Sequence, residues 1–331
     1  MTKLEQSMLT DFYDKRYEKD AYNLTCISDD ESSHIRNMLY SIQKRKLSTN
    51  ADKKIITLID YGCGDGRLHP LYEEIAQEVL SEDYILKVIG IDPSQSALSV
   101  YREKCNQSGY KVKSDNGVGK LCKIGEDPDN YIIGKRNVEV CLFCADIDIF
   151  NSLNALNWHV DFIISIAVTC HVLGRNNRKN MLNAFKMASS SLFLSQPTNE
   201  DFSSIQRRFH QMREEKKIIQ KSIKDLSSSD SDVLLLQKKL LYLNENLKDA
   251  QDDGEIYYSA GSVRRLADKL PEYKDLKIPY FGTTVELAKR AVEEVGYKFV
   301  TSTRAKFGCH KRWIVTLASD LFEVEDLNHL C

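Results

Sequence analysis

An apolar run from Ile55 to Ile59 leads into an acidic residue and three glycines at alternating positions: Asp60, Gly62, Gly64 and Gly66. Glycine adopts positive φ readily and has no Cβ, so this segment predicts a sharp turn whose backbone can lie against a ligand. The next segment, from His69 to Leu80, has the pattern of a helix, and the free amides at a helix N-terminus attract polar or anionic ligand atoms. The sequence therefore predicts a strand, a ligand-binding loop and a helix, in that order.

A second strand is predicted from Tyr84 to Ile91 and ends in Asp92. In nucleotide-binding α/β units, a carboxylate at this point accepts hydrogen bonds from the hydroxyl groups of a ribose. The dinucleotide fingerprint G-x-G-x-x-G would need a glycine at the position of Arg67. The observed D-x-G-x-G-x-G spacing therefore disfavours NAD and favours a different nucleotide cofactor.

This pattern resembles the first motif of the class I S-adenosylmethionine-dependent methyltransferases, and three further motifs of that family follow in order. The second falls on Asp92 and Pro93, and the third falls on Asp146 and Ile147, where the family places an acidic side chain and a backbone amide at the adenine edge. The fourth is the strand-like stretch from Asp161 with the polar turn that follows it. The resemblance implies S-adenosylmethionine as the cofactor, bound by Asp60, Gly62, Gly64, Gly66, Asp92, Pro93, Asp146 and Ile147.

The resemblance also implies an α/β fold with a doubly wound, mostly parallel seven-stranded sheet whose last strand is antiparallel. Two strand-like runs flank a turn around Lys306 to Lys311, as expected for that antiparallel edge strand. The expected divisions are a helical cofactor cover (1–50), the cofactor-binding core (51–200), an inserted helical hairpin (201–253) and the completion of the core (254–331). Within the long connection 109–136, a short hairpin of YKVKS with KLCKIG is an additional possibility.

The N-terminal segment from Phe12 to Asn23 looks like the part of these enzymes that covers the cofactor, with Tyr13, Arg16 and Tyr17 as candidate contacts. An arginine can pair bidentately with the methionine carboxylate, and a tyrosine ring can attract the sulfonium through its π face. The segment also fits a solvated amphipathic helix that packs two tyrosines on the domain. Both interpretations stand.

Residues 199–253 have helical periodicity, with two apolar stripes separated by the turn-forming SSSDSD. The stripes are Phe202, Ile205, Phe209, Met212, Ile219, Ile223 and Leu226, and then Val233, Leu236, Leu240, Leu243 and Leu247. This pattern predicts an antiparallel helical hairpin that rests on the core, closes as a lid or forms a dimer or partner interface. Its many basic residues fit either a solvated face or a guide for an anionic substrate or acidic partner.

A sulfonium methyl group is already electrophilic, so such an enzyme needs mainly to align a nucleophile, and no nucleophilic triad is visible. His171 is the candidate general base because its pKa range suits proton transfer, and it also fits a histidine that packs near the cofactor and orients the turn. Tyr257 and Tyr258 fit either an acceptor pocket or ordinary half-buried aromatics. The expected acceptor is an oxygen or nitrogen of a small molecule, a protein or RNA. The N/D-P-P-Y/F/W motif of enzymes that methylate nucleobase amines is absent.

Composition narrows the functional class further. The formal charge of -2 over 331 residues argues against a protein devoted to nucleic acid. The nine cysteines are scattered and many lie in apolar runs, which favours buried reduced thiols, and the pair Cys141 and Cys144 lies in a predicted strand that would point them to opposite faces. No metal site is therefore expected. No apolar run reaches the roughly 18 residues that a membrane span needs, and Met1 to Ser7 lacks a signal-peptide core, so we expect no membrane insertion and a cytoplasmic location.

The acidic C-terminal stretch DLFEVEDLNHLC looks similar to the translocation signals of bacterial effectors injected by type IV secretion systems, and it also fits an acidic cap on the last strand. Two functions of different class follow. The first is an active methyltransferase with the hairpin forming part of the acceptor site. The second is a cofactor-binding or catalytically degenerate module that acts through protein contacts of the hairpin, including an injected effector that works in a host cytosol.

Overall fold

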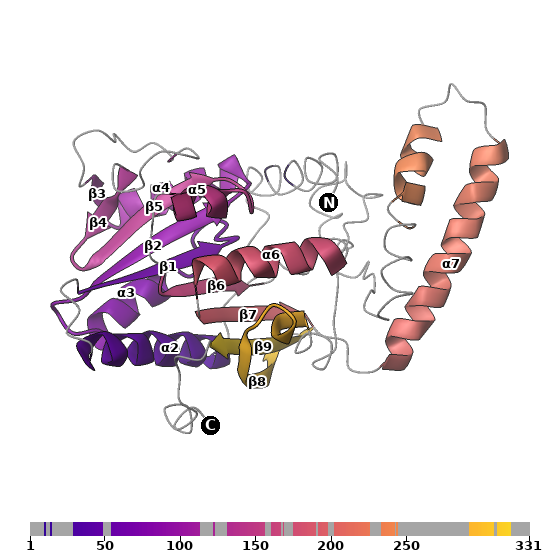
Figure 1. Ribbon diagram of the computed structural model, residues 1–331. Coiled ribbons are helices and arrows are strands. Elements are labelled where there is room, and N and C mark those ends of the chain that lie inside the picture. The colour runs from indigo at the N-terminus through magenta and orange to yellow at the C-terminus, as the bar shows by residue number, and fades with distance from the viewer. Residues whose placement is uncertain are drawn as a thin grey trace.

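The computed structural model describes residues 10, 14, 29–48, 54–112, 122, 131–155, 160–166, 168, 175–189, 191–197, 202–225, 233–241, 243, 291–307 and 310–318. Its centre is a single sheet of nine strands in the order β3-β4-β5-β2-β1-β6-β7-β9-β8 (Figure 1). The strands are β1 (Ile55–Tyr61), β2 (Ile85–Asp92), β3 (Lys111–Val112), β4 (Ile133–Lys135), β5 (Val138–Cys144), β6 (Phe162–Ile166), β7 (Ser191–Pro197), β8 (Lys298–Phe307) and β9 (His310–Ala318).

The central strands β5, β2, β1, β6 and β7 are parallel to one another, and β9 pairs antiparallel with β7. This arrangement confirms the predicted doubly wound, mostly parallel sheet with an antiparallel last strand. The predicted hairpin near the C-terminus is also present, since β8 pairs antiparallel with β9. The antiparallel strand is not at the edge, however. β9 lies between β7 and β8, and β8 forms the edge.

The two strands beyond the predicted seven come from the long connection after β2. β3 pairs with β4, and β4 pairs with β5, both antiparallel. The expected hairpin therefore forms with Ile133–Lys135 as the partner strand instead of KLCKIG. Within KLCKIG, Cys122 makes an isolated parallel bridge to Phe143 of β5, which shows that this part of the connection returns to the sheet separately.

Helices cover both faces of the sheet. They are α2 (Asp29–Ser48), α3 (His69–Glu78), α4 (Gln95–Gln107), α5 (Ile149–Ala155) and α6 (Arg175–Ala188), whereas a further helix, α7 (Phe202–Asp225), lies outside these layers. Apolar residues of α2, α3 and α4 share one core with Ile56 and Leu58 of β1, whereas residues of α5 and α6 share another core with Ile59 and Tyr61. This split follows from the alternation of side chains along a strand. The sheet is therefore buried on both sides, as parallel sheets require.

Helix α2 lies in the segment 1–50 that the sequence predicts to cover the cofactor. Its apolar side, including Ile35 and Ile42, is fully buried in the core under the sheet. Near its C-terminal end, the Lys46 ammonium donates to the Ile55 carbonyl at 2.8 Å and pairs with the Asp161 carboxylate at 3.0 Å. The α2 part of this segment is thus a layer of the core, and the domain boundaries stay a prediction.

The inserted segment contains a helical pair. Helix α7 packs against the helical residues 233–241 through a small apolar cluster centred on Ile219 and Leu243. An ion pair between Lys239 and Glu215 joins the two helices at 2.5 Å. Figure 1 shows the pair standing apart from the sheet layers. The described residues therefore form the helical hairpin that the periodicity predicts.

Candidate functional site

The glycine loop follows β1 and is tied to the neighbouring strand β2. The Gly62 and Cys63 amides both donate to the Ile91 carbonyl, at 2.7 and 3.2 Å. Gly62, Gly64 and Gly66 have φ of 78°, 55° and 75°. All three lie in the left-handed region that favours glycine, so the alternating glycines are needed for the backbone path itself.

Two of these glycines also have no room for a side chain. A Cβ on Gly62 would lie 2.1 Å from Cγ2 of Val168, and a Cβ on Gly66 would lie 2.2 Å from Cδ2 of Tyr101. The loop is therefore packed from both sides of the sheet. It has the form of a backbone cradle whose shape depends on missing Cβ atoms.

Asp60, at the start of the motif, is buried below this loop. The Tyr72 hydroxyl of α3 donates to its Oδ2 at 2.9 Å. Burial raises the pKa of Asp60 to about 7, while the hydrogen bond from Tyr72 and the charge of Arg67 act in the opposite direction. Asp60 therefore has a structural task, which is to anchor helix α3 beneath the loop.

Asp92, the predicted ribose acid, ends β2 and lies against the same loop. Its Oδ2 accepts from the Gly64 amide at 2.9 Å, and its Oδ1 accepts from the Ser94 amide at 2.8 Å. Burial raises the pKa of Asp92 to about 6, although both amide hydrogen bonds lower it. A carboxylate oxygen has two acceptor sites, so each oxygen retains capacity for a ligand hydroxyl.

Asp14 is a residue of the N-terminal segment that the sequence analysis did not single out. Its Oδ1 accepts from the Ser94 hydroxyl at 2.6 Å and from the Ser96 amide at 3.1 Å. These donors lie at the N-terminus of α4, where negative charge is favoured by the helix dipole. Ser94 could have been identified from the sequence, because a serine before a predicted helix indicates an N-cap. Nothing in the sequence indicated that the distant Asp14 would bind there.

Asp146 and Ile147 follow β5, the strand next to β2. The Tyr61 hydroxyl donates to Oδ1 of Asp146 at 2.6 Å, and the Ile147 amide donates to the same oxygen at 2.7 Å. The Ala145 amide donates to the Asp92 carbonyl at 3.2 Å. The carboxyl ends of β1, β2 and β5 are thus joined by hydrogen bonds that involve the predicted Asp92, Asp146 and Ile147.

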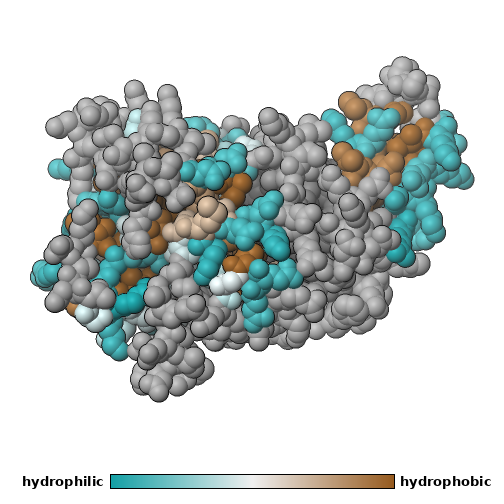
Figure 2. Space-filling view, viewed as in Figure 1, coloured by the Kyte–Doolittle hydropathy of each residue, from teal (hydrophilic) through white to brown (hydrophobic). Residues whose placement is uncertain are grey.

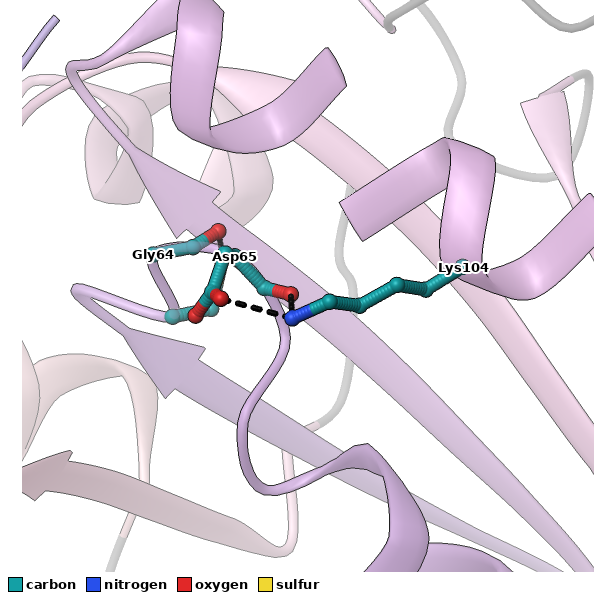
Figure 3. A network of polar contacts seen from close by, with 4 residues as sticks. Gly64, Asp65 and Lys104 are labelled. Atoms are coloured by element: carbon teal, nitrogen blue, oxygen red, sulfur yellow. Dashed lines mark hydrogen bonds and ion pairs between the residues drawn. The ribbon is translucent and has the colours of Figure 1, made fainter. Parts of the chain in front are cut away.

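Lys104 of α4 holds the glycine loop from outside. Figure 3 shows this side chain reaching Asp65, with its ammonium 2.6 Å from Oδ2 and 3.0 Å from the carbonyl oxygen of the same residue. On the other side, the Arg67 guanidinium donates to the Ile166 carbonyl of β6 at 3.2 Å. Arg67 occupies the position where the dinucleotide fingerprint requires glycine, and here it links the loop to the sheet.

The structure thus brings Asp60, Gly62, Gly64, Gly66 and Asp92 together at the carboxyl edge of β1 and β2, with Asp146 and Ile147 adjoining. Pro93 lies beside Asp92, and its carbonyl accepts a hydrogen bond from the Cys144 thiol at 3.5 Å. The other predicted site residues, Tyr13, Arg16, Tyr17, His171, Tyr257 and Tyr258, lie outside the described residues. The roles assigned to all of these residues stay predictions.

Five of the nine cysteines lie within the described ranges. There, Cys63, Cys105, Cys122 and Cys141 are buried, and Cys144 is exposed. Within the same ranges, no three His, Cys, Asp or Glu side chains are grouped closely enough to hold a metal ion. None of the helices in this part of the chain combines the length and the apolar character that crossing a membrane requires.

No protein-family model matches the sequence, and no curated protein matches it. Among solved structures, the chain is similar to magnesium protoporphyrin IX methyltransferase from Synechocystis PCC 6803 with bound SAM, at 10% identity and a TM-score of 0.44, covering 95% of this chain and 97% of that one. It is also similar to 1,6-didemethyltoxoflavin-N1-methyltransferase from Burkholderia thailandensis, at 10% identity and a TM-score of 0.44, covering 96% and 88%.

A third similar structure is the N-terminal domain of EvdMO1 with SAH bound, at 11% identity and a TM-score of 0.42, covering 93% of this chain and 95% of that one. At these identities and TM-scores, the likeness identifies neither the cofactor nor the reaction of this chain. The function is therefore inferred from the residues of the site itself.

Proposed function

We propose that this protein is an S-adenosylmethionine-dependent methyltransferase. The observation that carries the proposal is the contact between the Gly64 amide and the Asp92 carboxylate, at 2.9 Å. It joins a loop of three positive-φ glycines to the strand-end acid that the family uses for the ribose. At Gly62 the Val168 side chain already takes the space that a Cβ would need, so the loop can follow this path only with glycine.

The residues present fit this cofactor. Asp92 would hold the ribose hydroxyls, the glycine loop would lie along the methionine portion, and Asp146, held by the Ile147 amide, would face the adenine edge. Arg16, Tyr13 and Tyr17 are proposed to cover the methionine end. When bound, the cofactor supplies an electrophilic methyl group on a sulfonium. The protein's own task is to exclude water and to align an acceptor lone pair, which can contribute about 7 to 11 kcal/mol to lowering the barrier.

The proposed acceptor is an oxygen or nitrogen atom of a small molecule, a protein or RNA. His171 is the proposed base for the proton of that acceptor, and Tyr257 and Tyr258 are proposed to line its pocket. These three assignments rest on the sequence resemblance.

Calorimetric titration of the full chain with S-adenosylmethionine and S-adenosylhomocysteine, with NAD as the control ligand, tests the proposal. We expect binding of the first two in the micromolar range that is typical of enzyme ligands, and no binding of NAD. The Asp92→Asn variant should bind at least about tenfold more weakly, since it loses charge-assisted hydrogen bonds. Binding of NAD alone, or equal affinity in the variant, would contradict the proposal.

One observation favours the second candidate, a methyltransferase-like module that acts through protein contacts. The helical residues 233–241 bury Val233 and yet expose Leu234, Leu235 and Leu241 by 56%, 58% and 50%. Figure 2 shows brown surface at the end of the molecule where α7 lies. A helix with apolar residues on opposite sides is typical of one buried between partners. Sedimentation of the wild type and of a Leu234→Glu, Leu241→Glu variant should show a concentration-dependent assembly only in the former if this candidate holds.

A further inference from the structure

The residue between Asp60 and the first glycine is Tyr61, and its side chain lies on the opposite face of the sheet from that of Asp60. The Tyr61 ring packs against Phe150 of α5 and Phe185 of α6, with ring centroids 5.9 and 5.1 Å away. The residue is only 6% exposed. Helices on two sides of the ring thus fix its position, and the hydroxyl is directed to the loop after β5.

At that loop, the Tyr61 hydroxyl and the Ile147 amide donate to the same oxygen, Oδ1 of Asp146, at 2.6 and 2.7 Å. Two donors on one oxygen restrict rotation of the carboxylate about its last torsion. Burial and the neighbouring charge of Asp146 raise the pKa of Tyr61 well above its ordinary value. The phenol therefore stays protonated and remains a donor over the whole working range of pH.

We propose that Tyr61 is a positioning residue for base specificity: through Asp146, it makes the site prefer a nucleoside whose base has an exocyclic amino group over one with a carbonyl at that position. This inference rests on the proposed function. The inference extends the proposed function, because the motifs indicate an acid at the adenine edge and do not indicate which residue orients that acid.

The chemistry of the preference is that of a fixed acceptor. An ionised carboxylate only accepts hydrogen bonds, so a correctly oriented Asp146 pairs with an amino group. A carbonyl at the same position would place two acceptors against each other and leave both unsatisfied, which disfavours binding. Without the Tyr61 hydroxyl, the carboxylate can rotate, and both the gain from the amino group and the penalty for the carbonyl decrease.

The test compares two ligands that differ at one position of the base, S-adenosylhomocysteine and S-inosylhomocysteine, by calorimetry. For the wild type we expect a preference of at least about tenfold for the adenosyl compound, since hydrogen bonds to a charged group discriminate by this much or more. Tyr61→Phe keeps the ring contacts with Phe150 and Phe185 and removes only the hydroxyl. It should reduce the preference to about threefold or less, mainly by weakening the adenosyl compound.

Tyr72→Phe is the matched control, because it removes a buried hydroxyl from Asp60 at the same site but away from Asp146. It should change the affinity of both compounds by the same factor. Asp146→Ala and the double variant Tyr61→Phe, Asp146→Ala complete the comparison. If Tyr61 acts through Asp146, the double variant should have the preference of Asp146→Ala alone.

An unchanged preference in Tyr61→Phe would overturn the inference while the proposed function stands. A preference that falls further in the double variant than in Asp146→Ala would also overturn it, because Tyr61 would then act independently of the carboxylate. If the folded wild type binds neither compound, the proposed function falls and the inference with it. Circular dichroism and thermal melts check that each variant is folded.

Discussion

The Tyr72 hydroxyl donates a hydrogen bond of 2.9 Å to Oδ2 of Asp60, and both side chains are buried under the glycine loop. A carboxyl group in this position is costly to ionise. Its pKa of about 7 in the folded chain lies above the ordinary value of 3.8 that applies when the chain is unfolded. Between these two values, the folded state holds a proton that the unfolded state has lost.

The free energy of unfolding of the ligand-free protein should therefore contain a component that decreases as pH rises from about 4 to about 7 and is constant above that. Roughly three pKa units correspond to at most about 4 kcal/mol. Asp60→Asn should remove this component. Urea unfolding at pH 5 and pH 8 measures it, with the exposed carboxylate variant Asp83→Asn as a control that keeps the wild-type slope. The same slope in Asp60→Asn and the wild type would contradict the assignment.

Ligand binding at Asp92 should change with pH in the direction opposite to the stability change that Asp60 causes: the affinity should increase as pH rises. Ribose hydroxyls donate to the ionised carboxylate, so affinity for S-adenosylhomocysteine should decrease as pH falls through about 6. Well below that value, the loss should approach tenfold per pH unit for a single linked proton. Calorimetry between pH 5 and 8 measures this dependence. Asp92→Asn should bind more weakly with little change over the range, and a wild-type affinity independent of pH would count against Asp92 as the ribose acid.

Gly62→Ala should abolish ligand binding. The added Cβ would lie 2.1 Å from Cγ2 of Val168, and the residue has φ of 78°. The substitution is therefore opposed both by a steric clash and by the left-handed backbone conformation. Gly109→Ala is a matched control because Gly109 has φ of 84° with nothing within 4 Å of the added atom. The control should cost only the left-handed strain, about 1 to 2 kcal/mol, and should retain binding. Equal effects of the two substitutions on binding would show that the cradle does not depend on packing.

Lys104→Met should weaken ligand binding by a few fold with little effect on stability. An exposed ion pair is worth about 0 to 1 kcal/mol, but this one also holds the Asp65 carbonyl in the glycine loop. The control is Lys54→Met, which removes the ion pair of Lys54 with Asp83 between the starts of β1 and β2. Thermal melts and calorimetry of both variants separate the two effects. An affinity loss of the same size in both would refute a specific role of Lys104.

Lys46→Met should destabilise the fold by about 3 kcal/mol, because it removes the ammonium that pairs with the buried Asp161 carboxylate at 3.0 Å. The Thr57 amide, 2.9 Å from Oδ2 of Asp161, and the nearby charge of Arg45 remain and keep the cost at the lower end. Lys44→Met, an exposed position on the same helix, should change stability by less than about 0.5 kcal/mol. Urea unfolding distinguishes these outcomes, and similar values for the two would contradict the buried pair.

The residues that the sequence predicted well are those whose chemistry is local. Positive φ explains the glycines, and alternation along β1 explains which side chains enter which core. The contacts of Asp14, Tyr61 and Tyr72 could not be predicted, because each joins segments whose distance is set by the sheet. The hairpin partner of β3 was predicted wrongly for the same reason. The predicted partner, KLCKIG, has a suitable sequence pattern, but Ile133–Lys135 takes this place because it also pairs with β5.

The two extra strands make the ends of the sheet unequal. One end is β3, a strand of two residues, and the other is β8, a strand of ten. The backbone N–H and C=O groups along the edge of a sheet can pair with a further strand, and a longer edge strand has more such groups. Among the described strands, β8 is therefore where a further strand should add if copies of this protein exchange segments or a misfolded chain binds to a folded one. At the other end of the sheet, the short hairpin of β3 and β4 already covers β5.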